Sequence, residues 1–208
     1  MKHRFHTLAI LTALFCLHTC FCSADSVQTK WSALKRKLDY GKDGEFKGTL
    51  DEGNKLLGEI DALMKEAKDK NPPLVKIIDR EADKLRDALK VNKMILTVEN
   101  SEKTFNEKYE TAVACQQKVK EMEQAQAASG KPFSDEELET MDQQWESCLK
   151  TLKTLRSSVQ SLRKNCNRLA GQYERKWDEY ERKVDQLHKI AEEARNDLRM
   201  RRQAMRKR

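Results

Sequence analysis

The side chains best suited to chemistry in this sequence are its cysteines, histidines and paired carboxylates. Half of the six cysteines and three of the four histidines lie within residues 1–24, so the rest of the chain keeps Cys115, Cys148, Cys166 and His188. A single histidine cannot build a Ser/His/Asp triad, a Cys/His dyad or a histidine metal site within one chain. Carboxylate pairs such as Glu136 with Glu137 belong to a charged helix surface, where burial does not separate their pKa values. We therefore expect no enzyme, no cofactor and no metal site.

Residues 1–24 predict a secretory signal peptide. Lys2 and Arg4 precede an apolar run, and small residues at Cys22 and Ala24 suit cleavage after Ala24. The run is shorter than the ~20 apolar residues of a membrane-spanning helix, and no later stretch is apolar enough either. We expect a secreted, extracellular protein without a transmembrane segment, whose three remaining cysteines meet an oxidising environment.

The composition predicts long helices instead of a compact globule. Charged residues make up 36% of the chain, aromatic residues 6%, and there are only three prolines. Thr49 with Glu52 and Ser134 with Glu137 have the capping-box spacing that starts a helix. We expect a short N-terminal helix and a glycine-containing linker over 25–48, helices over 49–69, 73–128 and 134–194, and a basic C-terminal tail over 195–208.

A heptad pattern in the third of these helices determines the predicted fold class. Apolar residues from Leu138 to Tyr173 recur at alternating spacings of three and four, which is typical of a coiled-coil seam. The short turn near 129–134 folds this helix back on the preceding one. The prediction is an all-α, elongated antiparallel helical hairpin that widens at one end to a three-helix bundle, in which 49–69 covers 168–189.

The cysteine positions agree with such a hairpin. Cys115 and Cys148 lie equally far from the middle of the turn, so they should face each other across the two helices. Cys148 and Cys166 would be ~27 Å apart along one straight helix, far beyond the ~7 Å that a disulfide spans. We predict a disulfide between Cys115 and Cys148.

Cys166 then has no partner within the chain. It is a candidate for an intermolecular disulfide in a homodimer, or it is a buried seam residue. The helix over 134–194 could alternatively pair with a second copy as a parallel coiled coil, with Cys148 or Cys166 joining the chains.

The C-terminal tail carries more positive charge than a helical scaffold needs. Seven basic residues there face Asp197 alone, and they form the candidate polyanion-binding site: Arg195, Arg199, Arg201, Arg202, Arg206, Lys207 and Arg208. Outside the cell the matching polyanions are sulfated glycans and anionic membrane surfaces. A solvated helix end is the alternative, and Arg199 to Arg202 also resembles a furin-type cleavage site.

We expect, from these patterns, a secreted, non-enzymatic helical interaction or scaffold protein. Its expected partner is an extracellular protein or a sulfated glycan, with no specific nucleic acid. The alternative is a lipid-binding protein whose amphipathic helices open at a membrane surface, as in exchangeable apolipoproteins.

Overall fold

The computed structural model describes residues 26–206 of the chain. The predicted signal peptide therefore lies outside the described residues, as do Lys207 and Arg208. The all-α prediction is confirmed, since the described residues contain helices and a single isolated β-bridge between Tyr40 and Phe46. The chain divides into two compact units, one ending at Lys93 and the other beginning at Met94.

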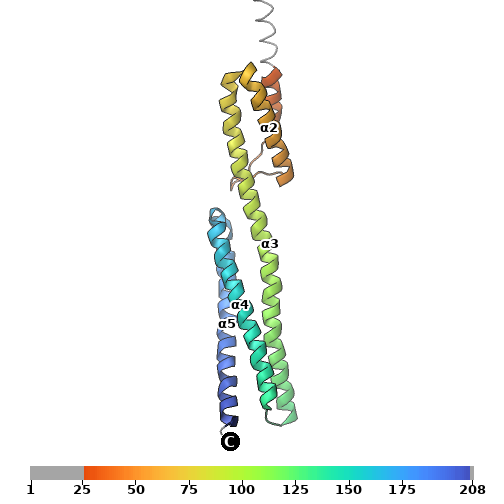
Figure 1. Cartoon of the computed structure of the whole chain (residues 1–208), viewed down its shortest axis with the longest axis vertical. Coiled ribbons are helices and arrows are strands. Elements are labelled where there is room, and N and C mark those ends of the chain that lie inside the picture. The colour runs from red at the N-terminus through yellow and green to blue at the C-terminus, as the bar shows by residue number, and fades with distance from the viewer. Residues whose placement is uncertain (1–25, 207–208) are drawn as a thin grey trace, which may run out of the picture. The chain divides into compact units, whose positions relative to one another are not determined.

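Four long helices and one short helical turn follow a first helical segment over residues 26–35 (Figure 1). They are α2 (Leu50–Lys70), α3 (Pro72–Ser129), α4 (Asp135–Asn165), the 3₁₀ turn η1 (Asn167–Leu169) and α5 (Ala170–Arg206). Residues up to Lys93 of α3 belong to the first unit, and its remainder belongs to the second. None of the helices in the described part of the chain is long and apolar enough to cross a membrane.

Local side-chain chemistry fixes where α2 and α4 begin. The backbone N–H of Glu52 donates to the Thr49 hydroxyl at 3.2 Å, and the Glu52 carboxylate accepts the Thr49 N–H at 2.8 Å. Ser134 and Glu137 make the same reciprocal pair at the start of α4. Each box satisfies two backbone donors that a helix end leaves without a partner. Both predicted capping boxes are confirmed.

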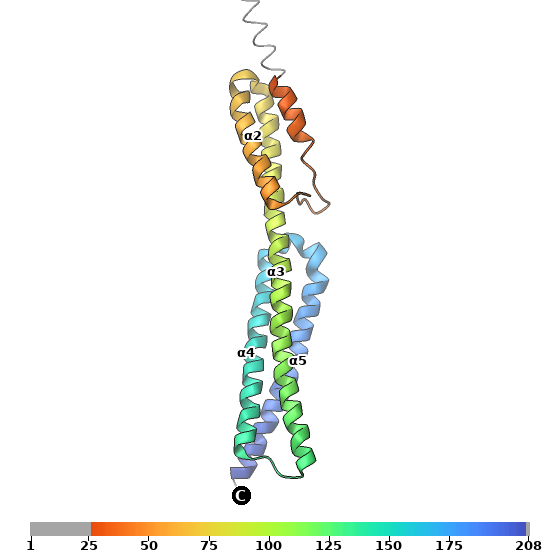
Figure 2. The same ribbon diagram turned by 90° about the vertical axis from the view of Figure 1, so that its right-hand side faces the viewer.

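The first unit packs residues 26–35, α2 and the first part of α3 around one apolar core (Figure 2). Trp31 from the first segment, Ile60 from α2 and Ile78 from α3 are buried together in it. The apolar face of α2, which was expected to cover residues 168–189, packs in this core against residues 26–35 and α3. The N-terminal helix supplies the second apolar face that α2 needs, which periodicity alone did not reveal.

Asn92 of α3 pins the glycine-containing linker to the first unit. Its Nδ2 donates to the carbonyl oxygens of Phe46 at 2.8 Å and Gly48 at 3.3 Å, while its Oδ1 accepts the Phe46 N–H at 2.8 Å. The side chain of Phe46 is buried in the core. One amide thus replaces the backbone partners that this irregular segment lacks, in keeping with the rule that buried backbone polar groups are paired.

The second unit packs α4, α5 and the later part of α3 side by side (Figures 1 and 2). The predicted single helix over 134–194 is wrong, because the chain leaves α4 after Asn165, turns through η1 and returns as α5. Asn165 and Asn167 flank the break, and asparagine is a weak helix former. The apolar pattern continues across the turn through Leu169, so the heptad spacing gave no sign of it.

Replacing Asn92 by Ala tests this anchor. Three hydrogen bonds disappear and the backbone groups of Phe46 lose their partners, so the free energy of unfolding should fall by about 1–3 kcal/mol. The amide of Phe46 should also exchange faster with deuterium. Asp79→Ala, at an exposed position of the same helix, is the matched control and should change neither quantity. An unchanged exchange rate at Phe46 in the Asn92 variant would contradict the assignment.

Candidate functional site

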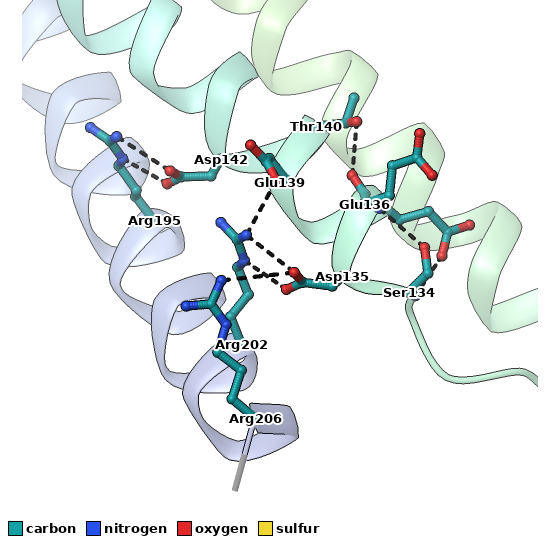
Figure 3. A network of polar contacts seen from close by, with 10 residues as sticks. Ser134, Asp135, Glu136, Glu139, Thr140, Asp142, Arg195, Arg202 and Arg206 are labelled. Carbon is teal, nitrogen blue, oxygen red and sulfur yellow. Dashed lines mark hydrogen bonds and ion pairs between the residues drawn. The ribbon is translucent and has the colours of Figure 1, made fainter. Parts of the chain in front are cut away.

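Residues 195–206 of the predicted basic tail form the last part of α5, which lies along the first turns of α4 (Figure 3). Arg195 donates from Nε to Asp142 Oδ1 at 2.7 Å and from Nη2 to Glu146 Oε2 at 2.6 Å. Arg202 donates in the same way to Asp135 Oδ1 at 3.0 Å and Glu139 Oε2 at 3.3 Å. Each guanidinium therefore bridges two α4 carboxylates that stand four residues apart.

This arrangement repeats every seven residues. Arg195 and Arg202 are one heptad apart on α5, and their main partners Asp142 and Asp135 are one heptad apart on α4. The side chains of Arg195 and Arg202 are only 18% and 21% exposed, which is low for arginine. A planar guanidinium that donates two hydrogen bonds to carboxylates forms a pair with a well-defined geometry.

Closer to the turn between the two helices, the arginines lie on α4 and the carboxylates on α5. Arg156 of α4 pairs with Asp185 of α5. Arg163 of α4 pairs with Asp178 and, at 3.0 Å, with Glu181 of α5. Arg156 and Arg163 are again one heptad apart. We call these four arginines and their carboxylate partners the arginine ladder; its sign reverses between Glu146 and Arg156.

The described part of the predicted tail, residues 195–206, is helical, and some of its arginines are paired with α4. Arg195 and Arg202 are engaged with α4, and Arg206 lies 3.8 Å from Asp135 while its side chain stays 69% exposed. Arg201 pairs with Asp197 on its own helix at 2.6 Å, and Arg199 is exposed. The tail prediction missed the acidic start of α4, although its cluster of six carboxylates over 135–146 is visible in the sequence.

Pairing with arginine changes the acidity of Asp135. Hydrogen bonds from Arg202, reinforced by the charges of Arg202 and Arg206, hold the pKa of Asp135 below its ordinary value of 3.8. A carboxyl group with a lowered pKa in the folded state stabilises that state above its unfolded pKa, and this contribution is lost as pH falls through the folded pKa. The ladder is therefore intact at neutral pH and is weakened by acid.

The three cysteines are buried in the second unit and are free thiols in the structure. Cys115 lies on α3 and Cys148 on the buried seam of α4. Burial, and next the charge of Cys115, raise the pKa of Cys148 to about 12. Cys166 caps the end of α4, and its side chain is 2% exposed. The candidate role of Cys166 in a link to a second chain stays a prediction.

The second unit also contains His188 and a groove beside Phe105. His188 lies 3.5 Å from Glu192 on the same helix, four residues away. Within residues 26–206, no group of three or more His, Cys, Asp or Glu side chains is placed to hold a metal ion. A groove of about 300 Å³ between α3 and α4 lies over Phe105 and is lined partly by hydroxyl groups, among them Ser101 and Ser158.

Arg202→Gln tests the pairing that defines the ladder. Loss of the guanidinium should raise the pKa of Asp135 toward its ordinary value, measured as the midpoint of a carboxyl-carbon NMR titration. Arg199→Gln removes the same charge from an exposed position of α5 and should leave that midpoint almost unchanged. Equal shifts in the two variants would mean that overall charge, and not the pair, sets the acidity of Asp135.

Comparison of the chain with protein-family models, with curated proteins and with solved structures finds no match.

Proposed function

We propose that this chain is a secreted, non-enzymatic helical interaction protein that contacts a sulfated polyanion through the exposed basic residues at the end of α5. The supporting observation is that Arg195 and Arg202 hold this end of the helix against α4, while Arg199, Arg201 and Arg206 remain exposed. Lys207 and Arg208 follow directly in the sequence. A helix that is held in place loses less conformational entropy on binding than a disordered tail would.

The ion pairs of the arginine ladder limit which arginines can contact a sulfated polyanion. Arg195 and Arg202 already meet carboxylates at hydrogen-bonding distance, so a sulfate would have to displace those partners. Arg199 is exposed, and Arg201 and Arg206, although each lies near one carboxylate, keep 48% and 69% of their side chains exposed, so a sulfate can reach them at a lower cost. We therefore assign the contact to Arg199, Arg201 and Arg206 and assign Arg195 and Arg202 to the support of the helix.

The lipid-binding alternative gains less support from the packing. Apolar side chains of α4 and α5 are directed into the second unit, where Leu152, Leu155 and Val184 are almost completely buried. An interfacial helix needs a broad apolar face on its outside. Met200 and Met205 are exposed near the end of α5, but they lie among charged residues.

A disulfide between Cys115 and Cys148 is part of the proposal for a secreted protein. Both side chains are buried, Cys115 on α3 and Cys148 on α4, and the charge of a Cys115 thiolate contributes to the raised pKa of Cys148. In an oxidising compartment, neighbouring thiols on adjacent helices would form a bond that closes the turn between α3 and α4. The loop closed in this way would restrict the unfolded chain.

Heparin chromatography tests the basic end of α5. Replacing Arg199, Arg201 and Arg206 by Gln should lower the salt concentration of elution and reduce the slope of log K against log salt by about two, because fewer counterions are released. Lys65, Lys68 and Lys76, changed together to Gln, are the matched control in the first unit. Equal elution of the two triple variants would refute the assigned contact.

Peptide mapping without reduction tests the disulfide in the secreted protein. We expect one linked pair of peptides, containing Cys115 and Cys148, and a free Cys166. After reduction the thiolate fraction of Cys148 at pH 8 should be about a thousandfold below that of an ordinary thiol, so iodoacetamide should label it only after unfolding. Alkylation of both cysteines without prior reduction, in unfolded protein, would exclude the bond.

A further inference from the structure

One long stretch of the second unit contains no acidic residue. Between Glu146 and Glu174 the sequence has six basic residues and no Asp or Glu, in a chain where acidic residues are almost as common as basic ones. The basic residues are Lys150, Lys153, Arg156, Arg163, Lys164 and Arg168. This stretch covers the second half of α4, the turn η1 and the first residues of α5.

The six residues divide into two groups. Arg156 and Arg163 turn toward α5 and are used in the arginine ladder. The other four, Lys150, Lys153, Lys164 and Arg168, are exposed, and within residues 26–206 they form no ion pair. The carboxylates of α5 that flank this part of α4 are already paired with Arg156 and Arg163, so the lysines keep their charge unneutralised.

Helical spacing places the three lysines on one line. Positions 150, 153, 157, 161 and 164 follow one another at intervals of three or four residues, which keeps them on a single face of α4. The buried seam of Leu152, Leu155 and Val159 occupies the opposite face. Ser157 and Ser161 stand between the lysines and are exposed. We call Lys150, Lys153, Ser157, Ser161 and Lys164 the α4 stripe; it is ~21 Å long at 1.5 Å per residue.

We propose that the α4 stripe is a second binding surface, and that its ligand is an extended sulfated glycan. Ammonium groups spread along a ~21 Å line match a linear chain that carries sulfates at intervals, more than a single compact anion. The Asn165 amide donates to the Ser161 hydroxyl oxygen at 3.2 Å, so the hydroxyl proton of Ser161 is available for a ligand oxygen.

The same face argues against an anionic membrane as the ligand. The α4 stripe holds only lysine and serine, without an apolar side chain that could enter the acyl region of a bilayer. Peripheral membrane contacts gain much of their strength from such insertion, whereas binding to a sulfated polysaccharide does not need it.

The α4 stripe is separate from the basic end of α5. The two helices of the ladder run antiparallel, so the end of α5 lies beside the first turns of α4, around Asp135 and Asp142. The stripe begins after Glu146, in the half of α4 where the ladder has reversed its sign. The inference does not depend on the contact proposed for Arg199, Arg201 and Arg206, and the two can be tested independently.

Binding of the full secreted chain to a heparin surface, at several salt concentrations, tests the stripe. Lys150, Lys153 and Lys164 are replaced together by Gln. The matched control replaces Lys118, Lys120 and Lys131, which are exposed residues of the same unit and carry the same total charge. Circular dichroism confirms that both variants keep their helices. The stripe variant should bind roughly tenfold or more weakly near 0.15 M salt, with a smaller salt slope, while the control binds like the parent chain.

The pattern of lost heparin binding among the variants tells whether the α4 stripe binds the glycan. Equal loss in the stripe and control variants overturns the stripe, because total charge would then explain the binding. Loss only in the Arg199, Arg201 and Arg206 variant also overturns it and leaves the proposed function standing. Loss only in the stripe variant supports the stripe and refutes the contact at the end of α5. If the stripe variant loses binding to vesicles of phosphatidylserine and phosphatidylcholine but not to heparin, the ligand class is wrong.

Discussion

The arginine ladder between α4 and α5 is the constraint on which the second unit depends. Leucine and valine seams attract any similar helix at almost any heptad offset, so they do not by themselves choose an orientation. The short turn through η1 makes α4 and α5 antiparallel, and the ladder favours one register, because the acidic start of α4 meets the basic end of α5 and the basic half of α4 meets Asp178 and Asp185. A parallel alignment would bring like charges together. The direction thus follows from the short connection through η1, the charges favour the register, and the apolar seam supplies the stability.

The sequence predicted most of the helix boundaries because their signals are local. Two capping boxes, the prolines after Asn71 and the turn at Gly130, which has a φ of +65°, each involve a few neighbouring residues. The break after Asn165 was missed since the apolar spacing runs through it and the turn contains no proline. What distinguishes the break is a long-range property, the matching of carboxylates before it with arginines after it. The anchor at Asn92 is long-range too, as it joins positions 46 residues apart.

The basic residues of the candidate site could be predicted from the sequence, but their ion pairs could not. A count of charges identified the end of α5 as basic, yet it could not separate Arg195 and Arg202, which have carboxylate partners, from Arg199, which is exposed. The same count overlooked Lys150, Lys153 and Lys164, because α4 as a whole is nearly neutral. Local excess of charge becomes a binding surface only where the neighbouring helix leaves it unpaired. That property belongs to the packing and is not visible in a single segment of sequence.

Ion pairs and apolar contacts respond differently to heat, and the contact between α4 and α5 contains both. Removing charged groups from water becomes less costly as temperature rises, because their hydration carries a strongly negative entropy, while the apolar contribution per unit area levels off. The share of the α4–α5 pairing that comes from the four arginines should therefore grow on warming. The register of α4 against α5, which the ladder favours, should therefore depend more on ion pairs at high temperature than at low temperature.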